Sequence, residues 1–310
     1  MTVVTILLAT YNGQKYIEEQ INSIIAQDFS DWKLILSDDG SSDSTAEILE
    51  SYAEKMPEKI VHYKSGKRFG NAQNHFMHLL EQFHNTPYIM FCDQDDVWHP
   101  DKISKTFARM EEIEKDPSVP ALVHTDLCVV DQSLNKLSDS FCRFSKLDGN
   151  RLGLGQLLVQ NVVTGCTLMI NRALAQLACE SPLPKNALMH DWWIALICSV
   201  FGTSSFLNQP TIDYRQHSNN SVGAKNVTSP EYLFAKLKSG AMKRSLKNAA
   251  LQAEAFIECY GEKIPQEKKK IISDFAKTKD LSIFRRNLVY LKHGLYKYGA
   301  IRILAQFLGG

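Results

Sequence analysis

Hydrophobic and polar residues alternate in blocks over the N-terminal third of the chain, and these blocks predict strands and helices in turn. Short apolar runs at 3–9, 33–37, 59–63 and 88–92 are typical of strands buried in a sheet. Between them, apolar residues recur at helical spacing over 14–27, 46–52 and 71–83. This regular alternation predicts an α/β fold with a mainly parallel sheet and right-handed crossovers.

The remaining sequence changes character near residue 228. Segments 121–126, 164–170 and 209–220 are predicted as further strands, the last of them running into a polar loop. From 230 onward the pattern is helical and rich in Lys and Arg, with an interruption at Pro265. We therefore expect an α/β domain over 1–228 and a basic helical region over 229–310.

Charge is distributed unevenly along this chain. The net charge is only +1 and charged residues make up 22%, as in ordinary globular proteins. Residues 231–310, however, carry 16 Lys and Arg against 7 Asp and Glu, so the preceding part is acidic. An acidic body with a basic C-terminal region favours an anionic partner such as a membrane surface. We expect no nucleic-acid partner.

The cysteines and the N-terminus bear on the cellular location. The 7 cysteines are scattered and form no CxxC pair, which argues against a disulfide framework or a zinc site. The apolar start TVVTILLATYNG turns polar too early for a signal peptide, and no apolar run approaches the roughly 18 residues of a membrane span. These features predict a cytoplasmic protein.

Three polar clusters each follow a predicted strand. They are Thr10-Tyr11-Asn12-Gly13, Asp38-Asp39-Gly40, and the acidic run of Asp93, Asp95 and Asp96 in YIMFCDQDDVWHPD. Since ligands of parallel α/β sheets bind beyond the carboxyl ends of the strands, the three clusters outline one site.

The acidic run DQDD has several interpretations. As an EF-hand loop it lacks the glycine of the sixth position, where Trp98 stands, and the glutamate of the twelfth. A phosphatase of the haloacid-dehalogenase type has DxD after a strand, but normally after the first strand of the fold. A loop that caps the next helix remains an alternative.

We favour a divalent-metal site, with Mn²⁺ or Mg²⁺ holding a nucleotide diphosphate, because a cation offsets the repulsion among close carboxylates. In this interpretation Asp93 reaches the nucleotide ribose and Asp95 binds the metal. The first two clusters favour a pocket for the base, to which Thr10 also belongs. In it Tyr11 stacks on the base ring, and Asp38 or Asp39 accepts the imide N–H of uracil or thymine. Alone, SDDGSSDST is an ordinary β-to-α turn with a helix cap.

ATYNG, SDDGSSDST and YIMFCDQDDVWHPDK, in this order and at these separations, resemble the GT-A fold glycosyltransferases of family 2 over about residues 1–225. The resemblance implies a Rossmann-like nucleotide-sugar-binding domain, a metal at DxD and inversion at the anomeric carbon. It also implies a catalytic base just before a helix in the second half, and MHDWWIAL supplies Asp191. The alternative for Asp191 is a helix N-cap, and Glu180 is the weaker competitor for the base.

The same resemblance implies a late histidine that completes the metal shell, and YRQHSNN offers His217, with Arg215 beside it for the diphosphate. Gly165 lies in NVVTGCTLMI, which resembles the family strand that lines the sugar and acceptor pocket. Trp192 and Trp193 offer an apolar face to the acceptor, although core packing explains them equally well. His75 and His78 are predicted on a helix surface.

Longer strings, among them HTDLCVVD, VVTGCTLMINRALA and YRQHSNNSVGA, resemble bacterial rhamnosyltransferases that build cell-wall polysaccharides. This implies dTDP-L-rhamnose as donor and a lipid-linked saccharide as acceptor. The alternatives are a UDP-hexose donor, a DxD phosphatase and a non-catalytic sugar-binding protein.

An apolar stripe with nearby Lys and Arg in the tail is typical of an interfacial helix, which places the protein at the inner face of the membrane. Its members are Phe284, Leu288, Leu291, Leu295, Ile301, Leu304 and Leu308. A helical cap on the α/β domain and a homodimer interface are the other uses of such a stripe.

Overall fold

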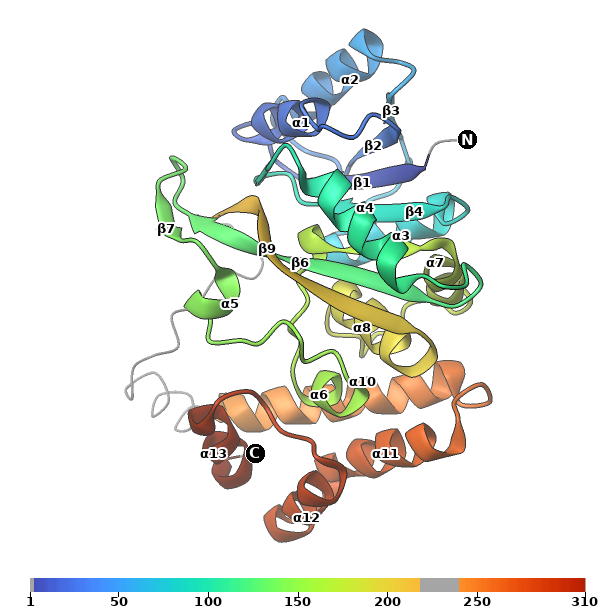
Figure 1. The fold of residues 1–310 in the computed structure, drawn as a ribbon, viewed down its shortest axis with the longest axis vertical. Helices are drawn as coiled ribbons and strands as arrows, with labels where there is room; N and C mark the ends of the chain where they lie inside the picture. The colour runs from blue at the N-terminus through green and yellow to red at the C-terminus, as the bar shows by residue number, and fades with distance from the viewer. Residues whose placement is uncertain (1–2, 218–239, 310) are drawn as a thin grey trace.

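A curled, mostly parallel sheet forms the centre of the N-terminal part in the computed structural model, which describes residues 3–217 and 240–309 (Figure 1). Its first half has the strand order β3-β2-β1-β4, with every neighbouring pair parallel. These strands are β1 (Val4–Thr10), β2 (Trp32–Asp38), β3 (Ile60–His62) and β4 (Tyr88–Cys92). The crossovers are α1 (Ile17–Ile25), α2 (Thr45–Lys55) and α3 (Ala72–Phe83). The predicted α/β alternation is confirmed.

The sheet continues beyond β4 in the order β8-β6-β9-β5, and β8 runs antiparallel to both of its neighbours. These strands are β5 (Val97–Trp98), β6 (Ala121–Val130), β8 (Met169–Asn171) and β9 (Thr203–Arg215), with β7 (Lys136–Ser138) paired to β6. The helices of this half are α4 (Lys102–Ile113), α5 (Phe141–Phe144), α6 (Leu154–Val159), α7 (Arg172–Cys179) and α8 (His190–Phe201).

Two predicted strands differ from the observed elements. Over 164–170 the chain first forms a 3-10 turn, η1 (Gly165–Thr167), because the amide and hydroxyl of Thr167 both donate to the Thr164 carbonyl, and only then enters β8. The strand predicted from 209 begins at Thr203, where polar residues pair with β6. The predicted boundary at 228 and the end of the polar loop at 218–220 lie outside the described residues.

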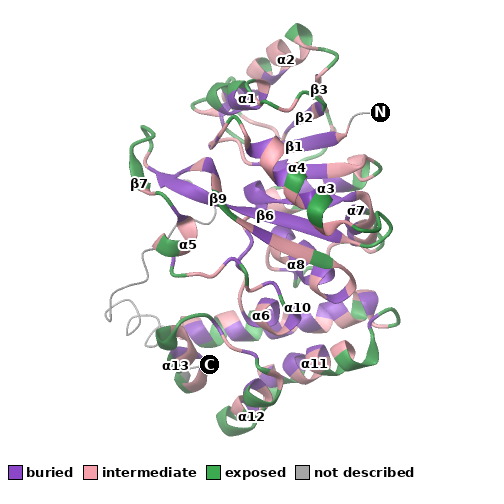
Figure 2. Ribbon diagram, in the orientation of Figure 1, coloured by how far each residue is buried: buried purple, intermediate pink, exposed green. Residues whose placement is uncertain are grey.

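The central strands are largely buried (Figure 2), and their side chains divide between two buried clusters, one on each face of the sheet. In β1, Ile6 and Leu8 contact the layer of α1, α2 and α4, while Leu7 between them contacts the layer that holds α3, α7 and α8. Burial on both faces accounts for the nearly continuous apolar strands of the sequence. The arrangement leaves the carboxyl ends of β1, β2 and β4 available for polar loops.

The C-terminal helices pack against α6 and α8 at one end of the molecule (Figure 1). They are α10 (Ala241–Tyr260), α11 (Gln266–Ala276), the 3-10 turn η2 (Lys277–Asp280), α12 (Ile283–His293) and α13 (Ala300–Gly309). Ala253 and Phe256 of α10 belong to the same buried cluster as Trp193 of α8. Within the described residues, no helix combines the length and the hydropathy that a bilayer span requires.

The apolar stripe of the tail is largely exposed, on α12 through Phe284, Leu288 and Leu291 and on α13 through Ile301, Leu304 and Leu308. Leu295 is an exception to the predicted stripe. Because α12 ends at His293 and Gly294 turns the chain with a positive φ, Leu295 points into the core instead.

Candidate active site

A cleft of about 720 Å³ lies at the carboxyl ends of β1 and β4. Most of the predicted site residues line it, namely Thr10, Tyr11, Asp39, Asp93, Asp95, Gly165 and Asp191. They come from segments far apart in the sequence, and the parallel sheet brings them to one edge. The remaining predicted residues are not among those that line the cleft, and they are Asp38, Trp192, Trp193, Arg215 and His217.

The two neighbouring aspartates after β2 have different partners. Asp38 accepts hydrogen bonds from the hydroxyl of Thr10 and from the amides of Gly40 and Ser41, so its carboxylate is used within the turn. Asp39 faces the cleft and accepts from the amides of Phe69 and Gly70, which fixes the loop before α3. Of the two, Asp39 is therefore the one placed for a ligand.

Gln94, the middle residue of DQD, holds the loop of Tyr11 in place. Its side-chain oxygen accepts from the Tyr11 amide at 2.8 Å and its side-chain nitrogen donates to the Tyr11 carbonyl at 3.1 Å. A Cβ on Gly13 would lie 2.4 Å from the same amide oxygen, so a larger residue there would displace the Gln94 side chain from the Tyr11 loop. The Tyr11 ring itself remains 55% exposed, as a residue that stacks on a ligand requires.

The acidic run forms a compact buried group. The Asp93 and Asp96 carboxylates and the Cys166 thiol lie within 4.8 Å of one another. Burial, together with the charges of Asp95 and Asp191, raises the pKa of Asp93 to about 7. Burial and the neighbouring carboxylates also raise the pKa of Asp96 well above its ordinary value, and one Asp96 oxygen has no hydrogen-bond partner among the described residues.

Asp95 and His217 meet at the rim of this group, although they are far apart in the sequence. The His217 Nε2 atom lies 2.7 Å from the Asp95 Oδ2 atom, and the His217 ring stacks on Tyr16 with centroids 5.2 Å apart. Imidazole and carboxylate are common metal ligands. The donor set therefore fits a divalent cation held by Asp95 and His217.

Arg215 is buried and fully engaged with the protein. Its Nε donates to the Asp95 carbonyl at 2.8 Å, its Nη1 donates to the Gln132 carbonyl at 2.7 Å, and its Nη2 is ion-paired with Glu19. The structure thus places the guanidinium behind the DxD loop, where it fixes the backbone of Asp95. It does not place Arg215 in the cleft.

Asp191 lies at the second position of α8 and faces the cleft, while Met189 is the N-cap. Its carboxylate accepts from Asn161 Nδ2 at 3.1 Å, from the Gly165 amide at 3.0 Å and from the following amide of Trp192. Burial raises the pKa of Asp191 to about 7, and these hydrogen bonds act in the opposite direction. Gly165 thus orients Asp191 through its backbone.

The two tryptophans after Asp191 point away from the cleft. Trp193 is 1% exposed and packs on Phe256, with centroids 5.4 Å apart. Trp192 donates its indole N–H to the Leu157 carbonyl at 2.6 Å. Trp193 therefore packs on α10 and Trp192 on α6, and neither ring lines the cleft.

Several cleft residues have no clear signal in the sequence. Arg68, Asn161 and His190 line the cleft, and Arg68 donates to the Gly40 carbonyl across the base-side loop. His75 also lines it and is 2% exposed, so the prediction that it lies on a helix surface is wrong. Its Nε2 lies 2.8 Å from the Ser37 hydroxyl of β2, a long-range contact that helical spacing does not reveal.

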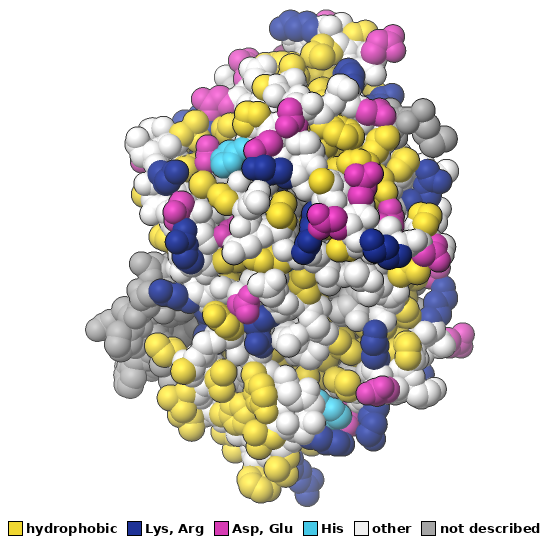
Figure 3. Space-filling view, in the orientation of Figure 1, with side chains coloured by type: hydrophobic (Ala, Val, Ile, Leu, Met, Phe, Trp, Pro, Cys, Tyr) yellow, Lys and Arg dark blue, Asp and Glu magenta, His cyan; other side chains and the backbone are white. Residues whose placement is uncertain are grey.

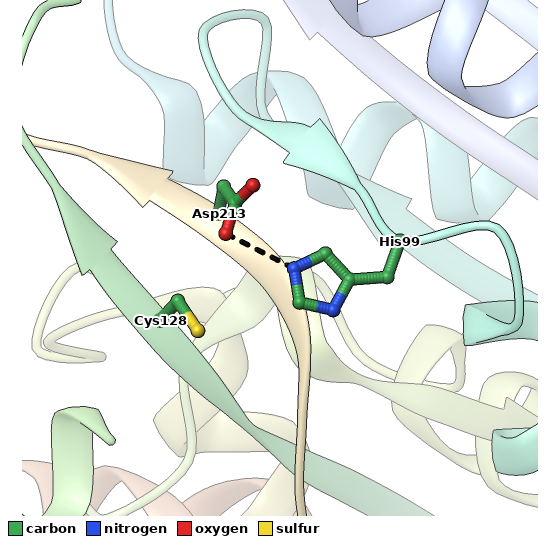
Figure 4. Close-up of side chains that lie close together, drawn as sticks. All are labelled: His99, Cys128 and Asp213. Carbon is green, nitrogen blue, oxygen red and sulfur yellow. Dashed lines mark hydrogen bonds and ion pairs between the residues drawn. The ribbon is translucent and has the colours of Figure 1, made fainter. Parts of the chain in front are cut away.

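A second group of potential metal ligands lies outside the cleft (Figure 4). His99 after β5 and Asp213 of β9 form a hydrogen bond of 3.0 Å, next to Cys128 of β6. Cys128 and Asp213 are register partners on neighbouring parallel strands, which explains why they meet. We interpret this group as a hydrogen-bonded pair that joins the end of β5 to β9.

Comparison with known proteins shows which family the chain belongs to and which solved structures share its fold. The model of the family described as "Glycosyl transferase family 2" matches residues 5–177 of this chain. The dTDP-rhamnosyl transferase RfbG of Shigella flexneri is 31% identical over 240 residues, covering 73% of this chain and 76% of that protein.

Two solved structures share the fold at low identity. S. aureus TarS 1–349 in complex with UDP-GlcNAc has a TM-score of 0.54 and 16% identity, covering 94% of this chain and 92% of that one. Against a longer TarS structure, the match covers only 43% of the TarS chain. Mannosyltransferase PcManGT from Pyrobaculum calidifontis, in complex with GDP-Man and Mn²⁺, has a TM-score of 0.54 and 18% identity. This match covers 93% of the present chain and 73% of PcManGT.

The sheet with a carboxylate-lined cleft at its carboxyl edge is that of a GT-A type glycosyltransferase. The chain belongs to glycosyl transferase family 2.

Proposed function

We propose that this glycosyltransferase moves L-rhamnose from dTDP-L-rhamnose onto a lipid-linked glycan, with inversion at the anomeric carbon. The observation that carries the mechanism is the Asp191 carboxylate, which is buried in the cleft wall and whose pKa is raised to about 7. A general base with such a pKa is well matched to proton transfer near neutral pH.

The donor occupies the side of the cleft formed by β1, β2 and β4. Tyr11 stacks on the base, Asp39 accepts its imide N–H, and Asp93 contacts the ribose. Asp95 and His217 would hold a divalent cation, Mn²⁺ or Mg²⁺, and its positive charge would offset the negative charge of the diphosphate leaving group. Asp38 and Arg215 support this side from behind, through the turn after β2 and the backbone of Asp95.

Asp191 acts on the acceptor. Its carboxylate takes the proton of the acceptor hydroxyl while that oxygen forms a bond to the anomeric carbon from the face opposite the leaving group. The bond between the anomeric carbon and the diphosphate oxygen breaks, and its electron pair leaves with the nucleotide diphosphate. Asn161 and Gly165 hold the carboxylate in place during this step.

Asp191→Asn tests the base. We expect transfer to fall by about a hundredfold or more, because general-base catalysis is worth roughly 10²–10⁴ in rate, while donor binding stays close to that of the unchanged chain. Transfer is measured with radiolabelled donor and donor binding by calorimetry. Glu180→Gln is the matched control, since Glu180 is half-exposed and paired with Lys263. Full transfer by Asp191→Asn excludes Asp191 as the base.

The identity of the donor rests on the relative that is a dTDP-rhamnosyl transferase. A UDP-hexose is the alternative, and the TarS complex with UDP-GlcNAc favours testing it. We expect dTDP-L-rhamnose with Mn²⁺ or Mg²⁺ to raise the melting temperature more than UDP-glucose, UDP-galactose or UDP-GlcNAc does. Chelation by EDTA is expected to remove most of the shift. A larger shift with a UDP-sugar contradicts the rhamnose donor.

The tail supports an acceptor carried by a membrane lipid. Arg302 of α13 donates to the Ser145 carbonyl at 2.7 Å, and the same segment contributes Phe141 and Leu147 to the cleft. The exposed apolar side chains of α13 therefore lie on a helix that contacts the cleft segment, and those of α12 lie on a helix that packs on α13. This arrangement fits a chain that works at the inner, cytoplasmic face of the membrane; a homodimer is the alternative use of that surface.

A further inference from the structure

A second cavity, of about 470 Å³, lies among the C-terminal helices, and none of the described residues that line it also lines the active-site cleft. It is enclosed by α10, η2, α12 and α13. Four of the described lining residues are cationic, and they are Lys243, Lys247, Lys279 and Arg286. Asp280 is the one acid among the described lining residues.

Arg286 is the buried cationic residue of this cavity. It is 7% exposed, and its Nε and Nη2 atoms have no hydrogen-bond partner in the part of the chain that the structure describes. Lys279 differs, because Glu254 at 2.8 Å and Asp280 at 3.5 Å balance its charge. A buried guanidinium without a partner is unfavourable unless an anion binds there. Its planar fork of donors matches the oxygens of a phosphate group.

Apolar side chains surround this cationic cavity. Ile283 and Leu308 line it, and beyond them Phe284 is 72% exposed, with Leu288 and Leu304 also exposed on the same two helices. Hydrophobic side chains gather over this end of the molecule, with Lys and Arg beside them (Figure 3). Phosphate-binding groups bordered by exposed apolar surface match the chemistry of a phospholipid, which joins a phosphate to acyl chains.

We propose that the Arg286 cavity binds the phosphate of an anionic lipid headgroup and thereby docks α12 and α13 on the membrane. This proposal rests on the proposed function, in which the acceptor is carried by a membrane lipid, and it names the surface that binds the membrane. A second copy of the chain suits the surface less well, because a symmetric dimer would place this patch against itself and bring two sets of Lys243, Lys247 and Arg286 together.

Sedimentation of the full chain with lipid vesicles tests the proposal. Vesicles of phosphatidylcholine are compared with vesicles that also contain phosphatidylglycerol, in the absence of any nucleotide sugar. We expect binding to require phosphatidylglycerol and to weaken about tenfold or more in Arg286→Gln, since charge-assisted hydrogen bonds are lost. Arg285→Gln is the matched control: it removes the same charge from the exposed neighbour and should cost no more than about fivefold.

Arg286→Lys separates recognition by the guanidinium fork from simple attraction. It keeps the charge and is a small change in packing, so diffuse attraction predicts no loss, whereas a phosphate-binding fork predicts a loss of several-fold. Equal losses in the two glutamine variants, or full binding by Arg286→Lys, overturn the proposal. So does inorganic phosphate that raises the melting temperature while vesicles remain unbound. Vesicle binding is measured without nucleotide sugar, so it does not depend on sugar transfer. Failure of the proposed transferase activity would appear in the transfer assay and not in the vesicle assay.

Discussion

At the scale of single residues, burial decides the ionisation of two carboxyl groups in the cleft. Removal from water raises the pKa of both Asp93 and Asp191 to about 7, and the charge of Asp191 adds to the effect on Asp93. The proton on Asp191 therefore favours the folded chain, and this group's contribution to stability is lost as the pH rises from its ordinary pKa through about 7. The same shift adapts Asp191 to general-base chemistry.

We expect kcat/KM to rise with pH through a limb near pH 7, because Asp191 must lose its proton before it acts. In Asn161→Ala the limb should move up by about one pH unit, since the ionised carboxylate loses a hydrogen bond worth about 1.5 kcal/mol. The pH of this limb is measured from profiles of kcat/KM against pH at saturating metal. Asn248→Ala, on the exposed side of α10, serves as the control and should leave the limb in place. An unmoved limb in Asn161→Ala contradicts the role of Asp191.

At the scale of elements, the apolar pattern predicts best where burial is complete. The run 88–92 coincides with β4 because all but its first residue is buried in the sheet. The beginning of β9 differs, since Thr203, Ser204 and Ser205 are polar and become a strand only through their pairing with β6. Likewise, the 3-10 turn at Gly165 depends on local hydrogen bonds that the apolar spacing of NVVTGCTLMI does not report.

Motifs predict which segments meet at the cleft, but not which way each side chain points. The resemblance selects the turn after β2, yet only the contacts distinguish Asp39 in the cleft from Asp38 within the turn. Arg215 is only two positions from the predicted metal ligand His217, but its side chain lies behind the DxD loop and not in the cleft. Asn161, which binds Asp191 from 30 positions away, has no local signal at all, because its role depends on the tertiary fold.

At the scale of the whole molecule, the sequence predicts two regions, whereas the packing joins them. Ala249, Ala253 and Phe256 of α10 belong to the same buried cluster as Trp193 of α8 and Leu157 of α6. The C-terminal helices thus complete the core below the helix that carries Asp191. The change in charge near residue 228 then marks a change of surface rather than a break in the core, and we expect the described parts to unfold together.

Phe256→Ala tests this cooperativity. Truncation of a fully buried phenylalanine leaves a cavity, and we expect a loss of about 3–5 kcal/mol in unfolding free energy within a single transition. Chemical denaturation followed by both tryptophan fluorescence and circular dichroism provides the measurement, because Trp193 contacts the site of the change. Leu291→Ala on exposed α12 is the control and should change stability by less than about 0.5 kcal/mol. Two separate transitions, with Phe256→Ala shifting only one of them, would show that the helical region is an independent domain.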